Sequence, residues 1–143
     1  MTYAPRSRAA RATGSYANIG LETEVLGASP ERLISLLFRG ALKAISQARY
    51  HLKNGNIQER GQALSKAIDI VDSGLKAGVD TERGGEIARL LIASYELVIR
   101  DLMQANLRSD ESKLDSAEKV LTDLASAWHT AVDPQFGDPP PSP

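Results

Sequence analysis

Apolar residues recur through the middle of the chain at intervals of three and four positions. In the first segment with this pattern they step by four, four, three, four and four, at Leu33, Leu37, Ala41, Ala44, Ala48 and Leu52. Residues at these intervals share one side of an α-helix. The helix is predicted to begin at Ser29, which can cap its free amides, with Pro30 and Glu31 in the first turn. Asn54 and Gly55 then form a typical helix stop.

A second helix is predicted over residues 56–77. Asn56 can serve as its N-cap with Glu59 three residues later, as in a capping box, and Gly78 marks its end. The predicted buried stripe of this helix comprises Ile57, Leu64, Ile68, Val71 and Leu75.

Two further helices follow a turn that contains Gly84 and Gly85. The third runs from Glu86 to Leu107, and one of its faces carries Ile87, Leu91, Ser94, Val98, Leu102 and Ala105. The fourth begins at Asp110, and its apolar positions repeat by three, four, three and four at Leu114, Ala117, Leu121, Leu124 and Trp128. Because Trp128 belongs to this stripe, we expect it in the core or at the core edge.

The number and spacing of these helices predict the fold class. Four helices of about 20 to 25 residues with short connections favour an all-α, antiparallel up-down four-helix bundle, since a short loop returns the chain alongside the helix it left. The bundle is predicted over residues 28–131. Residues 1–27 lack a sustained apolar period and are expected to be flexible, with a docking element near Tyr16 and Ile19. Residues 132–143 are rich in proline and are expected to form a disordered tail.

Composition excludes several classes of function. The chain has 143 residues, of which 42% are hydrophobic, which suits one domain with one core. Its 17 Lys and Arg residues nearly balance 18 Asp and Glu residues, so the field that attracts nucleic acid is missing. Cysteine is absent, and no segment approaches the roughly 18 apolar residues of a membrane span or has the apolar region of a secretory signal. These features predict a cytoplasmic protein without membrane insertion.

The sequence offers little support for catalysis. A dinuclear metal site in a helical bundle needs Glu-x-x-His pairs, but Ala48 and Ser126 stand three residues before His51 and His129. No triad context or phosphate-binding motif accompanies either histidine. We therefore expect neither an enzyme nor a bound cofactor or metal.

One alternative function rests on His51. The run from His51 to Gly55 is similar to the His-x-Leu-Lys-Gly signature of histidine phosphotransfer domains, which are also four-helix bundles, although the spacing differs by one residue. The simpler interpretation is an exposed histidine in the last helical turn, where positive charge suits the helix end.

The third helix has more apolar surface than one buried stripe requires. Further apolar residues lie off its main face, at Leu90, Ile92, Tyr95, Leu97, Ile99 and Met103. The first helix has a milder surplus at Ile34, Phe38 and Ile45. Such a helix is either central in its own domain or presents a groove to another protein, and the pattern leaves both possibilities open. A groove would suit an amphipathic segment that folds on binding, and Tyr16 with Ile19 would compete for it.

Several segments in order resemble one family, the FliS flagellin export chaperones. The stretch from Ser29 to Ala41 is similar to the family motif Ser-Pro-x-x-Leu-Ile-x-x-Leu-Tyr-x-Gly-Ala. Further matches are Asn54-Gly55-Asn56-Ile57, Ala63-Leu64-Ser65-Lys66-Ala67, Gly84-Gly85-Glu86-Ile87-Ala88, Tyr95 and Ala105-Asn106-Leu107. The resemblance runs from about Tyr16 to Trp128. Phe38-Arg39 replaces the frequent Tyr-Asp pair, and Leu90 replaces a frequent Asn.

The resemblance implies a function. Members bind the C-terminal segment of flagellin, prevent premature polymerisation and assist delivery to the export gate of the flagellar type III apparatus when loaded. An N-terminal Tyr, here Tyr16, covers the binding surface in this family until flagellin displaces it. Whether the empty chain forms a homodimer stays open. The predicted partner-binding residues are Tyr16, Ile19, Ile34, Phe38, Leu90, Tyr95, Leu97 and Met103.

Overall fold

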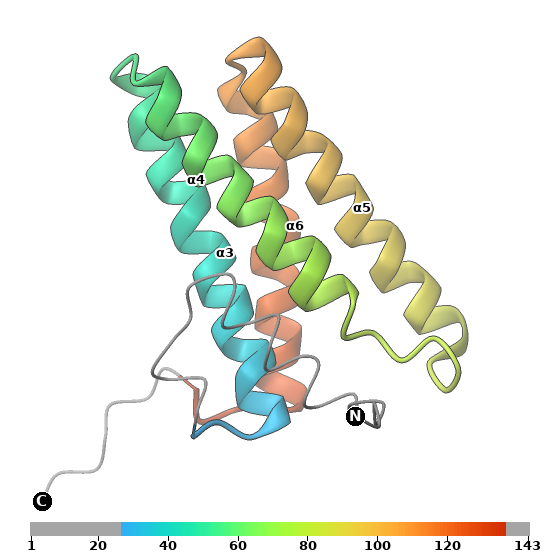
Figure 1. The fold of residues 1–143 in the computed structure, drawn as a ribbon. Helices are drawn as coiled ribbons and strands as arrows, with labels where there is room; N and C mark the ends of the chain where they lie inside the picture. Colours follow the sequence, from blue (N-terminus) through green and yellow to red (C-terminus); the bar gives the residue numbers. More distant parts are fainter. Residues whose placement is uncertain (1–26, 137–143) are drawn as a thin grey trace, which may run out of the picture.

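The computed structural model describes residues 27–136, and within that range the chain is helical without a β-strand (Figure 1). The elements in order are α3 (Pro30–Lys53), α4 (Ile57–Asp69), the π-helical segment η1 (Ile70–Lys76), α5 (Gly85–Arg108) and α6 (Glu111–Ala131). Because η1 continues α4 without a break, the elements form four rods. This confirms the predicted four-helix bundle. The docking element predicted near Tyr16 and Ile19 lies outside the described residues.

The helices alternate in direction around the bundle. The α3–α4 and α5–α6 connections lie at one end, and the loop between η1 and α5 lies at the other (Figure 1). Helix α3 packs against α4, η1 and α6, while α5 packs against α6, α4 and η1. Helices α3 and α5 therefore occupy opposite corners, so the outer side of α5 has no helical neighbour within residues 27–136.

Local capping signals position the helix ends. The Ser29 hydroxyl accepts a hydrogen bond from the Arg32 amide at 3.1 Å, and the Asp110 carboxylate accepts one from the Ser112 amide at 2.9 Å. The capping role predicted for Asn56 is wrong, because its side chain makes no cap hydrogen bond and lies against His51 instead. The helix starts there without that cap.

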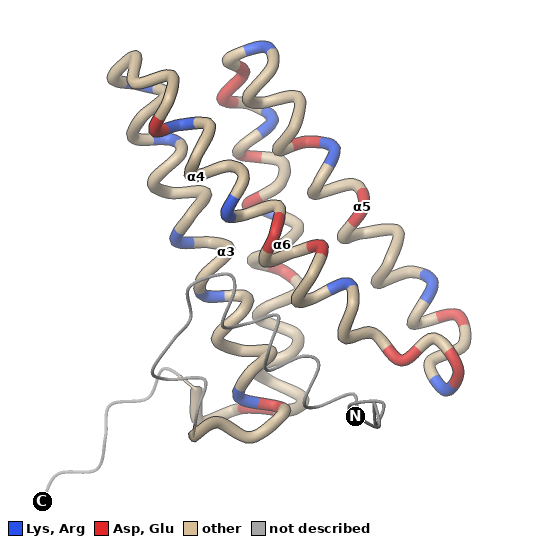
Figure 2. The backbone as a smooth tube through the Cα atoms, in the orientation of Figure 1, with Lys and Arg blue, Asp and Glu red and all other residues tan. Residues whose placement is uncertain are grey.

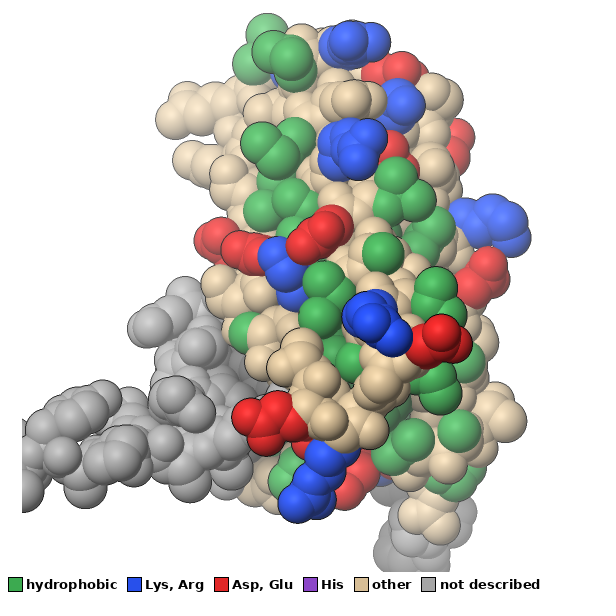
Figure 3. Space-filling model, turned by 90° about the vertical axis from the view of Figure 1, so that its right-hand side faces the viewer, with side chains coloured by type: hydrophobic (Ala, Val, Ile, Leu, Met, Phe, Trp, Pro, Cys, Tyr) green, Lys and Arg blue, Asp and Glu red, His purple; other side chains and the backbone are tan. Residues whose placement is uncertain are grey.

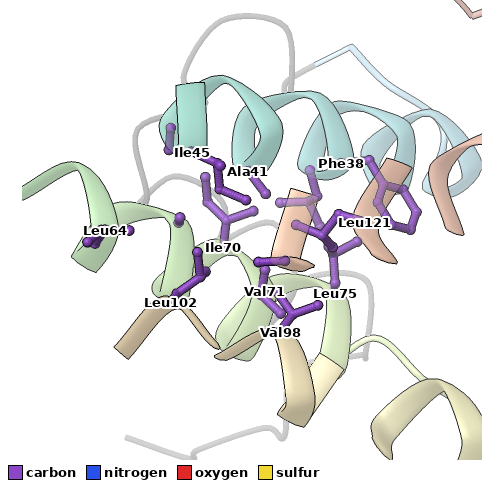
Figure 4. Close-up of a cluster of buried hydrophobic side chains, with 14 of the residues drawn as sticks. Phe38, Ala41, Ile45, Leu64, Ile70, Val71, Leu75, Val98, Leu102 and Leu121 are labelled. Carbon is purple, nitrogen blue, oxygen red and sulfur yellow. The ribbon is translucent and has the colours of Figure 1, made fainter. Parts of the chain in front are cut away.

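Apolar side chains from all four rods meet in one core. Figure 4 shows members of this cluster from each helix: Phe38, Ala41, Ile45, Leu64, Ile70, Val71, Leu75, Val98, Leu102 and Leu121. Trp128 packs at the edge of the core, where its indole N–H donates to the Ser35 hydroxyl at 3.1 Å, as its place on the stripe predicted.

The continuous helix predicted over 56–77 changes character at Ile70. The wider π-helical winding of η1 turns both Ile70 and Val71 into the core, whereas the α-helical stripe included only Val71. Gly74 permits close approach to α3, since a Cβ there would lie 3.0 Å from both methyl groups of Leu37. Ile57, predicted to be buried, is 69% exposed in the first turn of α4.

The disordered tail predicted from residue 132 is wrong for residues 132–136. Asp133 is buried, and its carboxylate accepts two hydrogen bonds from the Arg32 guanidinium, at 2.8 and 2.9 Å, and one from the Ser35 hydroxyl at 2.7 Å. The Phe136 ring then lies against His129 and beneath the Arg32 and Arg39 guanidinium groups. We call residues 132–136 the C-terminal clasp, because they join the end of α6 to the start of α3.

We expect Asp133→Asn to lower the melting temperature by a few degrees at neutral pH. Hydrogen bonds from Arg32 and then Ser35 lower the pKa of the Asp133 carboxyl. A lowered pKa in the folded state means that the carboxylate stabilises the fold above the ordinary carboxyl pKa of about 4 and loses this effect as pH falls through the lowered value. Thermal melts from pH 7 to pH 2 should therefore show wild type and variant converging in acid. Asp69→Asn, at an exposed site, is the control, and a constant difference at every pH would contradict the clasp's ionic character.

Candidate protein-binding face

Helix α5 carries most of the large apolar side chains that the fold leaves in contact with solvent. Five of the eight exposed large hydrophobic residues in the described range belong to it, which makes α5 the main candidate for a binding surface. Their exposed fractions range from 44% to 82%. We define the α5 face by these residues: Ile87, Leu90, Leu97, Met103 and Leu107.

The α5 face extends along the molecule rather than forming a single spot. Figure 3 shows apolar side chains distributed over the length of this side, with single charged side chains between them. Isolated exposed apolar residues are ordinary in soluble proteins, but five large ones on a single helix are typical of an interaction surface.

Contacts to neighbouring helices orient the face. The Asn106 side chain accepts a hydrogen bond from Arg60 of α4 at 3.1 Å, and Glu96 lies 3.5 Å from Lys76 of η1. Met103 stands three residues before Asn106, so it lies on the edge of α5 toward α4. Leu90 and Leu97 are seven residues apart and lie on the opposite edge, toward α6. The two edges flank a polar outer ridge.

Arg60 of α4 holds the C-terminal end of α5 in place. Its buried guanidinium donates to the Asn106 carbonyl at 3.1 Å and to the Ser109 hydroxyl at 2.9 Å, in addition to the Asn106 side chain. These groups lie at the helix C-terminus, where carbonyls lack intrahelical partners. A charged side chain of α4 thereby holds the last turn of α5 in place.

Net charge does not dominate this side of the protein. Figure 2 shows Lys and Arg alternating with Asp and Glu along α5. The helix contains three acidic and three basic residues: Glu86, Arg89, Glu96, Arg100, Asp101 and Arg108. Affinity for a partner must therefore come mainly from the apolar side chains.

The predicted partner-binding residues divide into three groups. Leu90, Leu97 and Met103 are exposed on α5, at 68%, 44% and 59%. Ile34 is half-buried on α3 beside the core. Tyr16 and Ile19 lie outside the described residues.

Phe38 and Tyr95 are placed in the core instead of on the surface. They are only 2% and 4% exposed, and their ring centroids are 6.5 Å apart. Burial raises the pKa of the Tyr95 hydroxyl to about 12, as expected for a phenol removed from water. The two rings pack on the core side of α5. Because they are buried there, they cannot make the direct contact with a partner that was predicted for them. The spacing of apolar residues along α5 does not distinguish positions exposed at its outer edges from the buried position of Tyr95.

Ile87 and Leu107 were missed as surface residues. Ile87 shares the predicted core face but lies in the first turn of α5 and is 71% exposed. Leu107 is 82% exposed one residue before the helix ends. Nearness to a helix end is the sequence signal that marks both.

His51 is a half-buried side chain in the last turn of α3. Its Nδ1 atom lies 3.1 Å from the Asn56 amide nitrogen, and its ring meets Tyr50 edge-on at 5.2 Å. This arrangement fits a structural role at the helix end, and no contact of the described residues favours the phosphotransfer alternative. Over the same range no helix is long and apolar enough to cross a membrane.

A helical bundle that exposes several large apolar side chains on one helix without a helical neighbour on that side is typical of protein-binding modules. The family described as "Flagellar protein FliS" matches residues 12–135. Similar proteins include the flagellar secretion chaperone FliS of Salmonella typhimurium, 48% identical over 80% of this chain and 84% of the relative. The flagellar secretion chaperone FliS of Escherichia coli is 41% identical over 87% of this chain and 91% of the relative. The flagellar secretion chaperone FliSB of Pseudomonas aeruginosa is 39% identical over 84% of this chain and 94% of the relative.

The chain belongs to the FliS family of flagellar secretion chaperones. The resemblance stated from sequence motifs is thereby confirmed, as is the prediction of a chaperone rather than an enzyme. Its general role is that of a flagellar export chaperone with a flagellar protein as binding partner.

Proposed function

We propose that this chain is a cytoplasmic chaperone that binds the C-terminal segment of flagellin, prevents its premature polymerisation and assists its delivery to the flagellar type III export apparatus. The observation that carries the proposal is the α5 face, an open apolar surface along one helix of a flagellar export chaperone. The export gate components bind the loaded chaperone.

An apolar helix face suits a particular kind of ligand. An amphipathic segment that is unfolded alone gains the free energy of apolar burial when it folds as a helix on such a face. Part of that gain offsets the entropy of ordering the segment. While it is bound, the segment's apolar residues are unavailable to other flagellin subunits, which is the physical basis of preventing polymerisation.

The N-terminal residues enter the proposal as a cover. Tyr16 and Ile19 supply an apolar pair that occupies part of the binding surface in the empty chaperone and yields it to flagellin. Such a cover reduces the exposed apolar area between export cycles, at the cost of some affinity.

Calorimetric titration of the full chain with a peptide of the flagellin C-terminal segment tests the proposal. We expect saturable binding with a negative heat-capacity change, because apolar surface is buried and a disordered segment folds. The titration is repeated at several temperatures to obtain that change.

An unrelated amphipathic helix of similar length and charge is the control peptide. Selective binding of the flagellin peptide supports the proposal. Absence of both heat and a shift in melting temperature, or equal binding of the two peptides, contradicts it.

A further inference from the structure

Asp101 is a buried carboxylate without a partner. The residue is 5% exposed, and its side chain takes part in no hydrogen bond or ion pair in the part of the chain that the structure describes. The other buried polar side chains in that range are satisfied: Ser35 and Asp133 by each other and their neighbours, and Arg60 by Asn106 and Ser109. A buried charge is unfavourable unless it is paired, so Asp101 requires an explanation that the bundle itself does not supply.

The carboxylate is nevertheless reachable from outside. Across residues 27–136, the one side-chain nitrogen or oxygen that is fully enclosed without a partner is Nε2 of His129. The unpartnered oxygens of Asp101 therefore keep contact with the surface while the rest of the side chain is covered.

Asp101 lies in line with the exposed leucines. Positions 87, 90, 94, 97 and 101 are separated by three, four, three and four residues, so they form one stripe on α5. Ile87, Leu90 and Leu97 are its exposed apolar members, and the Ser94 hydroxyl donates to the Leu90 carbonyl at 2.8 Å. The stripe is thus apolar over most of its length and ends in one carboxylate that still has its hydrogen-bonding capacity free.

We propose that Asp101 determines specificity on this surface by pairing with one basic side chain of the bound flagellin segment. This inference rests on the proposed function. The stripe from Ile87 to Asp101 is about 21 Å long, which corresponds to about four turns of a partner helix. It therefore selects a segment with apolar residues at intervals of three and four and an arginine or lysine at one end. A segment without the basic residue leaves the carboxylate covered and unpaired, which lowers its affinity.

The test uses the full chain and the flagellin peptide. Asp101→Asn retains the size of the side chain and removes its charge, and Asp101→Ser is a second variant of smaller volume. We expect either change to weaken binding by about 10- to 100-fold, as for loss of a charge-assisted hydrogen bond. The melting temperature of the free protein should stay unchanged or rise, because an unpaired buried charge has been removed. Asp123→Asn, at an exposed position of α6, is the matched control and should bind normally.

Peptide variants identify the pairing residue. Each arginine and lysine of the peptide is replaced by glutamine in turn, and the affinities for wild type and Asp101→Asn are combined in double-mutant cycles. One peptide position should lose its effect when Asp101 is replaced. Normal binding by both Asp101 variants, or an equal loss with every peptide, would overturn the inference and leave the proposed function intact. A wild-type protein that binds no peptide would contradict the proposed function itself.

Discussion

Replacement of both Leu90 and Leu97 by glutamate is expected to weaken binding of the flagellin segment by at least about 100-fold. Covering one leucine side chain contributes about 1.5–3 kcal/mol, and each 1.4 kcal/mol corresponds to a factor of ten in affinity. The two substitutions also place charges where a partner would have to remove their water. Both side chains face solvent in the free protein, so the fold should be retained.

Calorimetric titration and thermal melting distinguish lost binding from lost structure. The control is Tyr50→Glu with Ile57→Glu, a pair that is also exposed, at 59% and 69%, but lies outside α5. We expect normal affinity for the control pair and similar melting temperatures for both double variants. If the control pair abolished binding while Leu90 and Leu97 tolerated glutamate, the binding surface would lie at the α3–α4 end of the bundle.

Most helix ends were predictable because they depend on neighbouring residues, although the side-chain cap expected at Asn56 is not formed. The third helix, expected from Glu86 to Leu107, spans Gly85–Arg108, and Ser29 caps the first helix as expected. The fourth helix, expected to begin at Asp110, begins at Glu111 with Asp110 as its cap. Capping and glycine signals act over a few residues, so a single sequence contains all the information they need.

The C-terminal clasp was not predictable in this way. Arg32 and Asp133 are 101 residues apart in the sequence, and neither belongs to an apolar period. Their contact exists because α6 ends beside the start of α3, which is a property of the assembled bundle. A proline-rich composition beyond residue 133 then suggested disorder for a segment whose first residues are anchored by an ion pair.

In the candidate site, too, features that depend on one helix were predictable and features that depend on its neighbours were not. Sequence identified α5 as the helix with surplus apolar surface and named Leu90, Leu97 and Met103, which are exposed. It also named Tyr95, which is buried, because periodicity describes one helix and not the positions of its neighbours. Asp101 was missed, since its lack of a partner can be recognised only once the surrounding side chains are placed.

A buried and an exposed leucine of α5 are expected to differ in how much they contribute to stability. We expect Leu102→Ala to lower the free energy of unfolding by about 3 kcal/mol, because Leu102 is fully buried and truncation leaves a cavity in the core. Leu107→Ala is the matched control at 82% exposure and should change stability by less than about 0.5 kcal/mol. The identical substitution on one helix cancels the difference in helix propensity between leucine and alanine. Urea unfolding followed by circular dichroism measures both.

The two variants also test whether α5 maintains the bundle with one side and binds the partner with the other. If Leu102→Ala unfolds more readily yet still binds the flagellin peptide under conditions where it is folded, the inner side of α5 maintains the bundle and its outer side recognises the partner. An equal loss of stability in both variants would mean that Leu107 is covered in the free protein, and the α5 face would then be shorter than the exposed residues indicate. A loss of binding by folded Leu102→Ala would instead show that core packing beneath the face sets its shape, because the substitution touches no exposed atom of it.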